Sequence, residues 1–286
     1  MTANEEIERR ARFEFGANWA RFLAQLDEER IAAAQASLQQ MLGLSSLAGL
    51  RFLDIGSGSG LFSLAARRLG ASVHSFDYDP KSVACAQELR RRYFPSDPSW
   101  RIEQGSVLHV EYMRSLGEFD VVYSWGVLHH TGAMWLALEN AIGRVASAGG
   151  RMFIAIYNDQ GWKSHAWWFV KRFYNRLPRL LRAPFLWSVS GIVRALVILK
   201  YTLKLQPMTA ISPMLSDRRE RGMSARNDTV DWIGGFPFEF CTFDTLAAYL
   251  SARGFALTNS RRDDSQGCNE LVLQRTTATV STGGGG

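Results

Sequence analysis

A strand, a glycine-rich turn and a helix follow one another between residues 50 and 69. Apolar residues predict a buried strand that runs through Asp54 into glycines at positions 56, 58 and 60. Apolar side chains then recur at helical spacing, and Gly70 stands where a C-terminal cap belongs. Glycines let the backbone pass close to a ligand, because a β-carbon there would collide with it. The segment predicts a ligand site at this turn, the alternative being a tight turn without a ligand.

The glycine spacing and Asp54 indicate which ligand would bind. Dinucleotide-binding turns have the spacing G-x-G-x-x-G and hold a pyrophosphate at the helix N-terminus. Here the spacing is G-x-G-x-G, and an acid lies two residues before the first glycine. A carboxylate would repel a pyrophosphate but would pair with an amino group. The turn therefore favours S-adenosylmethionine over a dinucleotide.

A second strand is expected over residues 72–77, and it ends in Asp77. Asp79 and Pro80 then form the pattern of an N-cap followed by proline at the first helical position. An acid at the end of the second strand lies across the crevice from the glycine turn, where a ribose would present its two hydroxyls. We expect Asp77 to hold the ribose and Asp79 to cap the helix.

The alternation of strand and helix continues along the chain. Further strands are expected at 101–107, 119–126 and 152–156, with a helix at 133–146 before the last of them. This alternation predicts a parallel sheet with helices on both faces and a ligand at the carboxyl ends of the strands.

With these elements, the chain resembles the class I S-adenosylmethionine-dependent methyltransferases. The resemblance covers residues 50–157 and resumes at 242–274, and it includes the strand-four ending from Trp125 to His130. It implies an α/β fold with a doubly wound, mostly parallel seven-stranded sheet, an antiparallel last strand, N-terminal helices and a helical insertion after strand five. Within the family, the small-molecule and quinone-pathway O-methyltransferases are loosely similar.

The resemblance also implies a cofactor site. The glycine turn would line the methionine part, Ser106 and Val107 would flank the adenine, and Ser124 would face the sulfonium. The predicted S-adenosylmethionine-binding residues are Asp54, Gly56, Ser57, Gly58, Gly60, Asp77, Ser106, Val107 and Ser124.

The chain is predicted to be one domain with elaborations. The methyltransferase domain is expected over 46–157 and 242–275, a helical substrate cap over 158–241, and a disordered tail over 276–286. Residues 1–45 carry an aromatic stripe that fits either a packing face or a lid over the cofactor. The three cysteines have no metal-ligand spacing, so no metal site is expected.

The stretch 160–216 has an unusual composition. It contains nine Lys and Arg residues and no Asp or Glu, whereas the whole chain carries a net charge of +6. Aromatic and aliphatic residues are interleaved with the basic ones, and the longest apolar run is too short to span a membrane. The stretch therefore fits a cap over an apolar acceptor, either a cap alone or one that also touches an anionic membrane surface through residues 160–205. A dimer interface is a further alternative. A nucleic-acid surface fits less well, because such surfaces rarely carry long aliphatic runs.

Methyl transfer from a sulfonium is an in-line displacement, and a hydroxyl acceptor also needs a base. The candidates for catalysis are His130, His129 and Asp159. The candidates for acceptor binding are Tyr157, Asp231, Trp232 and Glu239, while Arg218–Arg221 could bind an acidic substrate.

The expected function is S-adenosylmethionine-dependent methylation of a small or lipid-like acceptor, with O-methylation favoured. The alternatives are N- or C-methylation, RNA methylation through the basic stretch, and a nicotinamide-dependent dehydrogenase. The acidic, polar start of the chain predicts a cytoplasmic location, with peripheral contact at the inner membrane face as a further expectation.

Overall fold

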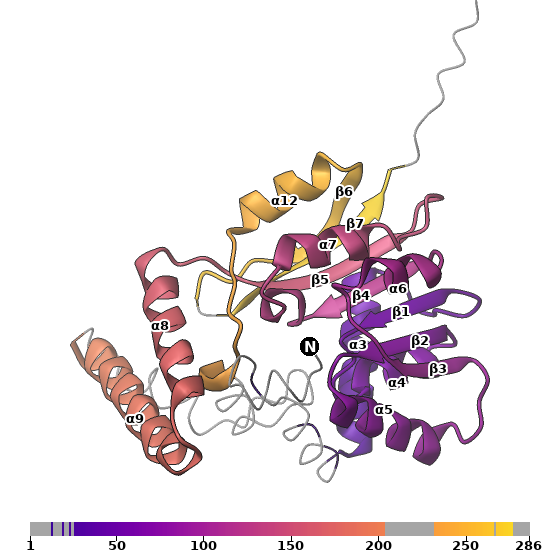
Figure 1. Ribbon diagram of the computed structural model, residues 1–286. Helices are drawn as coiled ribbons and strands as arrows, with labels where there is room; N and C mark the ends of the chain where they lie inside the picture. Colours follow the sequence, from indigo (N-terminus) through magenta and orange to yellow (C-terminus); the bar gives the residue numbers. More distant parts are fainter. Residues whose placement is uncertain are drawn as a thin grey trace, which may run out of the picture.

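A seven-stranded sheet forms the centre of the molecule (Figure 1). The computed structural model describes residues 13, 19, 23, 26–203, 232–265 and 267–276. The strand order is β3-β2-β1-β4-β5-β7-β6, in which β7 runs antiparallel to both of its neighbours. The strands are β1 Arg51–Ile55, β2 Ser72–Asp77, β3 Trp100–Gln104, β4 Val121–Trp125, β5 Arg151–Tyr157, β6 Phe255–Arg261 and β7 Cys268–Arg275. The predicted doubly wound sheet with an antiparallel last strand is confirmed.

Helices cover both faces of the sheet. On one face lie α3 (Glu28–Leu42), α4 (Leu61–Arg68) and α5 (Pro80–Tyr93). On the other lie α6 (Val110–Ser115), α7 (Met134–Ile142) and α12 (Phe243–Ser251). Side chains of successive strand residues alternate between the two cores, so that Phe52 packs with the first group and Leu53 with the second.

The helix boundaries follow local signals. Asp79 accepts a hydrogen bond from the Lys81 amide, and Pro80 occupies the first turn of α5, as the N-cap pattern predicts. Gly70 follows α4 with a φ of 98°, a conformation that glycine adopts without steric cost. The helical residues 28–42 pack on α4 and complete the sheet cover, so this part of the predicted lid is not over the ligand site.

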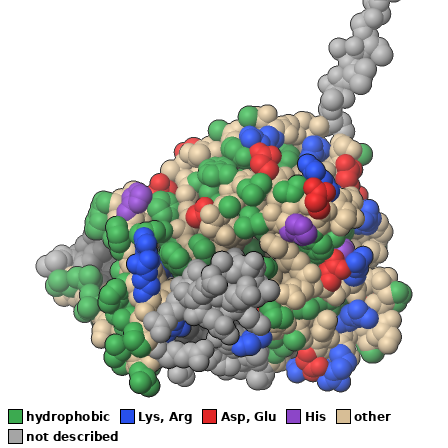
Figure 2. All heavy atoms as spheres, viewed as in Figure 1, with side chains coloured by type: hydrophobic (Ala, Val, Ile, Leu, Met, Phe, Trp, Pro, Cys, Tyr) green, Lys and Arg blue, Asp and Glu red, His purple; other side chains and the backbone are tan. Residues whose placement is uncertain are grey.

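The insertion after β5 forms two helices, α8 (Trp162–Arg176) and α9 (Arg179–Leu203), which project from one end of the molecule (Figure 1). Hydrophobic side chains gather at this end (Figure 2), among them Trp162, Phe169 and Trp187, which are 75%, 66% and 63% exposed. No helix within the described ranges is long and apolar enough to cross a membrane. Of the predicted tail, Thr276 donates its backbone amide to the Gly254 carbonyl at 2.8 Å, whereas residues 277–286 and the Arg218–Arg221 cluster lie outside the described residues.

Candidate functional site

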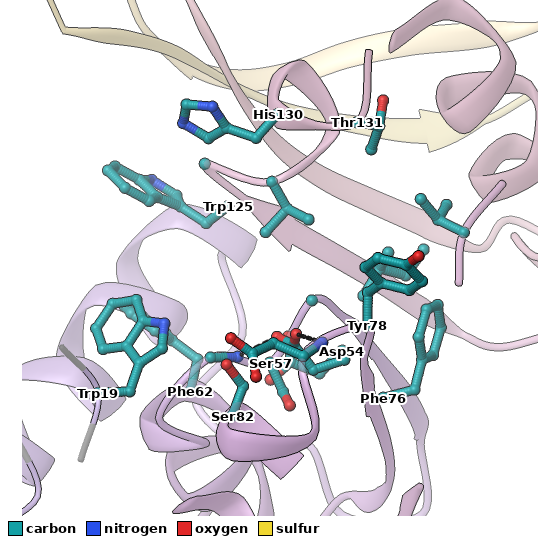
Figure 3. A pocket seen from close by; sticks show the side chains of 18 of the residues that line it. Trp19, Asp54, Ser57, Phe62, Phe76, Tyr78, Ser82, Trp125, His130 and Thr131 are labelled. Carbon is teal, nitrogen blue, oxygen red and sulfur yellow. Dashed lines mark hydrogen bonds between the residues drawn. The ribbon is translucent and has the colours of Figure 1, made fainter. Parts of the chain in front are cut away.

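A cavity of about 360 Å³ lies at the carboxyl ends of β1, β2 and β4. It is placed where the strand order reverses between β1 and β4, the position at which open α/β sheets bind ligands. Figure 3 shows two opposed sides: Asp54 and Ser57 on one, and His130, Thr131 and Trp125 on the other. Its volume lies within the range of small-molecule sites.

The glycine turn forms the first side of this cavity. Gly56, Gly58 and Gly60 have φ values of 74°, 55° and 81°, which residues other than glycine rarely adopt. A β-carbon on Gly56 would lie 2.4 Å from Val127, and one on Gly58 would lie 2.9 Å from the Trp19 ring. Gly56 and Gly58 are therefore required by protein neighbours at the cavity wall, and not only by a ligand. Gly60, predicted as a cofactor residue, lies outside the cavity wall, where a β-carbon would lie 2.8 Å from Ala86.

The amide groups of the turn point back to the end of β2. Gly56 and Ser57 donate to the Phe76 carbonyl at 2.9 and 3.1 Å, and Gly58 donates to a carboxylate oxygen of Asp77 at 2.9 Å. The other Asp77 oxygen accepts the Asp79 amide at 2.9 Å. These amides are consequently already bonded within the protein, whereas a pyrophosphate site would need them for the ligand.

Asp54 lies at the floor of the cavity and is 2% exposed. Ser63 donates to its carboxylate at 2.5 Å, and the Ser63 hydroxyl also contacts Ser75 at 2.7 Å. Burial raises the pKa of Asp54 to about 7, with a further increase from the charge of Asp77, although the bond from Ser63 acts in the opposite direction. A cationic group in the cavity would favour the ionised form of this carboxylate.

Two further features suit a polar ligand with an apolar ring. The Ser57 hydroxyl is buried in the cavity wall and has no hydrogen-bond partner among the described residues, so it is available to a ligand. Ser106 and Val107 also line the cavity, together with Phe76 and Tyr78, and form its wall at the ends of β2 and β3.

His130 lies on the opposite wall with a fixed tautomer. Its Nδ1 atom lies 2.6 Å from the Pro237 carbonyl oxygen, which can only accept a hydrogen bond, so Nδ1 carries the proton. In the neutral form of the ring, the lone pair is then on Nε2. The side chain is 5% exposed and lines the cavity, so the imidazole lies beside the ligand space.

The neighbouring His129 has a structural role. It is fully buried, does not line the cavity, and accepts a hydrogen bond from the Tyr157 amide through Nδ1 at 3.2 Å. Burial lowers the pKa of His129 well below its usual value, and the charges of His130 and Lys171 add to this effect. His129 therefore stays neutral and positions the end of β5.

Three other predicted site residues lie outside the cavity wall. Ser124 is completely buried and donates to the Ile55 carbonyl at 3.2 Å. Asp159 accepts the Gly161 amide at 2.7 Å, within the turn that precedes α8. Glu239 accepts the Met134 amide at the start of α7, and burial raises its pKa. Their polar atoms bond to backbone groups, and none of the three residues lines the cavity. This corrects the expectation that they face cofactor or acceptor; Asp231 lies outside the described residues.

The sequence reasoning did not identify Lys171 as part of this region. It counted Lys171 among the basic residues of a surface, yet the side chain is 0% exposed. Its ammonium donates to the Trp232 carbonyl and lies 4.2 Å from the Trp232 ring centroid and 4.6 Å from that of Phe238. Trp19, Trp125 and Val127 are further cavity residues. Trp19 belongs to the N-terminal aromatic stripe, and the other two belong to the strand-four ending noted in the sequence. Among the described residues there is no cluster of side chains able to hold a metal ion.

Comparison with known proteins supports the relation suggested by this geometry. Residues 53–154 match the family model of the methyltransferase domain. The ubiquinone biosynthesis O-methyltransferase of Xanthomonas oryzae pv. oryzae (strain PXO99A) is 33% identical over 112 residues, which are 39% of this chain and 45% of that protein. The protein of the same name from Rhodopseudomonas palustris (strain BisB18) is 30% identical over 137 residues, 48% of this chain and 51% of that protein. The chain thus spans about half the length of the curated relatives it matches.

Among solved structures, the magnesium protoporphyrin IX methyltransferase of Synechocystis PCC 6803, crystallised with bound SAH, shares the fold. It has a TM-score of 0.52 and 14% sequence identity, and the match covers 91% of this chain and 94% of that one. At this identity the likeness concerns the fold alone.

Proposed function

We propose that this chain is a class I S-adenosylmethionine-dependent methyltransferase and that it methylates a hydroxyl group on a small aromatic or lipid-like acceptor. The observation that carries the proposal is the placement of His130. Its ring, with the proton on Nδ1, stands across the cavity from the glycine turn. A base on one wall and a cofactor turn on the other suit proton removal from an acceptor held between them.

S-adenosylmethionine, when bound, supplies an electrophilic methyl group on a sulfonium. We assign the amino group of its methionine part to Asp54, the ribose hydroxyls to Asp77, and the adenine to the wall that includes Ser106 and Val107. The buried carboxylate of Asp54 and the buried hydroxyl of Ser57 fit a cationic, polar group. The turn amides, already bonded to Phe76 and Asp77, argue against the pyrophosphate of a nicotinamide cofactor.

The walls near His130 favour a flat, apolar acceptor. Trp125, Tyr157 and Trp232 line this part of the cavity, and the rings of Tyr157 and Trp232 meet edge to face at 5.0 Å. The relatives' printed name, an O-methyltransferase of ubiquinone biosynthesis, points to the same acceptor chemistry. Residues 158–241 would then form a cap over the acceptor, with Tyr157, Trp232 and Asp231 as its binding candidates.

In the proposed step, the acceptor oxygen forms a bond to the methyl carbon as the bond from that carbon to sulfur breaks. Nε2 of His130 takes the hydroxyl proton, and the resulting imidazolium returns it to solvent after the step. The aromatic walls hold the acceptor in line and exclude water, which supplies most of the acceleration for a displacement of this kind.

Calorimetric titration tests the cofactor assignment directly. We expect S-adenosylhomocysteine to bind, and Asp54→Asn and Asp77→Asn each to weaken it about tenfold or more, since each removes a charge that faces the ligand. Asp79→Asn is the matched control, because asparagine caps a helix as well as aspartate does. Binding of reduced nicotinamide dinucleotide without binding of S-adenosylhomocysteine would contradict the proposal.

A second proposal concerns the exposed face of α8 and α9, which we assign to peripheral contact with an anionic membrane surface. Trp162, Phe169 and Trp187 are exposed on these helices, and Lys and Arg are the only charged residues in 160–203. Aromatic side chains insert into the boundary of headgroups and acyl chains, and basic ones attract anionic lipids. Such a location would let an acceptor with a long apolar tail reach the cavity from the membrane.

A further inference from the structure

The buried face of α8 makes two hydrogen bonds to backbone carbonyls of the segment 232–238. Lys171 donates through its ammonium to the Trp232 carbonyl. Asn175, one helical turn further on and 2% exposed, donates through its amide nitrogen to the Gly234 carbonyl at 2.7 Å. Residues four apart on a helix share one face, so the two side chains hold the segment together.

The contacts of Lys171 are costly to lose. Its ammonium lies 4.2, 4.6 and 5.6 Å from the ring centroids of Trp232, Phe238 and Tyr157. An ammonium buried among ring faces gains cation–π attraction in addition to its hydrogen bond. The three rings come from the segment and from the end of β5, so this one cation ties α8 to both walls near His130.

The same segment determines the state of His130. The Pro237 carbonyl accepts the Nδ1 proton at 2.6 Å, and two residues later the Glu239 amide donates to the His129 carbonyl at 2.9 Å. Phe13 adds a backbone hydrogen bond to the Phe236 carbonyl at 3.0 Å. The segment is thus held by α8 at its start and bonded to the histidine pair at its end.

We propose that Lys171 and Asn175 are positioning residues that keep the Pro237 carbonyl on Nδ1 of His130, and thereby keep the Nε2 lone pair in the cavity. An imidazole without an acceptor beside Nδ1 loses its preference for a proton on that nitrogen. The insertion therefore acts on the reaction through the tautomer of the base, besides covering the acceptor. The effect on the reaction rests on the proposed function, in which His130 is the base, whereas the effect on the position of the Nδ1 proton does not.

Among the described residues, the titratable and charged groups around His130 come from four parts of the chain. They are His129 beside it, Tyr157 at the end of β5, Lys171 in α8, and Glu239 after the segment. The tautomer must therefore be measured at one fixed pH in all variants.

The test is nuclear magnetic resonance of the full chain with ¹⁵N-labelled histidine and no added ligand, at pH 8. In the wild type we expect His130 to carry its proton on Nδ1. Lys171→Met and Asn175→Ala should each lower the ratio of the Nδ1–H to the Nε2–H form about tenfold, the equivalent of one hydrogen bond. Arg172→Met is the matched control, since this neighbour on α8 stacks on Trp168 and should leave the ratio unchanged.

Asn175→Ala keeps the buried charge, so it tests the proposal even when Lys171→Met does not fold. An unchanged tautomer in folded Asn175→Ala would overturn the proposal. Turnover then separates the base role of His130 from the positioning role of Lys171 and Asn175. A normal turnover rate in His130→Ala would exclude the base role, but the tautomer ratio would still measure the positioning role. When His130 is the base, Asn175→Ala should lower kcat and leave the affinity for S-adenosylhomocysteine unchanged, because the cofactor turn lies on the opposite wall.

Discussion

His130 and Pro237 are 107 positions apart in the sequence, yet the Nδ1 atom of one lies 2.6 Å from the carbonyl oxygen of the other. This contact joins the end of the fourth strand to the chain that returns from the helical insertion. It assigns the Nδ1 proton of a ring that lines the cavity. The base role proposed for this histidine thus depends on the folded arrangement of both segments.

Replacement of this imidazole should separate catalysis from cofactor binding. For His130→Ala we expect turnover of a hydroxyl acceptor to fall about 10²- to 10⁴-fold, the usual contribution of a general base. The affinity for S-adenosylhomocysteine should remain within about twofold, because the cofactor turn lies on the other wall. Steady-state kinetics and calorimetry measure the two effects. Asp159→Asn, in the nearby turn, is the control that should retain activity, and full turnover in His130→Ala would exclude the base role.

The buried Asp54 carboxyl predicts a pH dependence of stability. Its pKa is about 7 in the folded protein and 3.8 as the ordinary value, so between these values the folded state holds a proton that the unfolded state releases. The free energy of unfolding must therefore fall as pH rises through this window. Between pH 5 and pH 7 the loss from this one group should be about 2 kcal/mol.

Asp54→Asn removes that titration. In urea denaturation without ligand, the wild type should lose stability from pH 5 to pH 8 relative to the variant, which should also bind S-adenosylhomocysteine weakly. The neutral His129 is common to both proteins, so its opposite contribution at low pH cancels in the comparison. Parallel stability curves for the two proteins would show that the Asp54 carboxyl is ionised throughout.

Two glycines have nearly the same φ but different neighbours, so alanine substitutions at both distinguish the cost of backbone strain from the cost of steric contact. Gly56 and Gly126 have φ values of 74° and 72°, but a β-carbon on Gly56 would lie 2.4 Å from Val127, whereas one on Gly126 would meet nothing within 4 Å. Gly126→Ala should cost about 1 to 2 kcal/mol of stability, the cost of a left-handed residue. Gly56→Ala should cost about 1 to 3 kcal/mol more through overpacking.

Gly56→Ala should also weaken binding of S-adenosylhomocysteine, since Val127 lines the cavity and would have to move. Denaturant titration and calorimetry of both alanine variants measure these differences. Equal losses of stability in the two variants would contradict the steric part of the argument.

Flotation with liposomes tests the exposed face of the insertion. We expect the chain to bind vesicles with anionic lipid and to be released by salt, because screening weakens the attraction of the basic residues. Trp187→Glu should reduce binding strongly. The control is Trp135→Glu on α7, an exposed tryptophan on another part of the surface. Absence of binding by the wild type would leave α8 and α9 with the role of a substrate cap alone.

Local sequence signals accounted for one half of the site. The glycine turn, Asp77 and the Asp79 cap each depend on neighbours within a βα unit, and their positions follow from spacing alone. The wall near His130 could be predicted less well, because polar residues at strand ends have either a ligand or a backbone group as their partner. Ser124 and Glu239 bond to backbone groups of other segments, and nothing in their own surroundings in the sequence indicates this. Asp159 instead bonds to the Gly161 amide within its own turn.

The sequence by itself thus determined the order of strands and helices, the sheet and the glycine turn with its acids, since periodicity, capping and turn chemistry act over a few residues. Only the tertiary structure decided which histidine lines the cavity, which of its nitrogens carries the proton, and that Lys171 is buried behind the acceptor wall. Those properties arise from contacts between segments 60 to 110 residues apart. Such contacts depend on how the insertion folds back, which no local pattern of residues encodes.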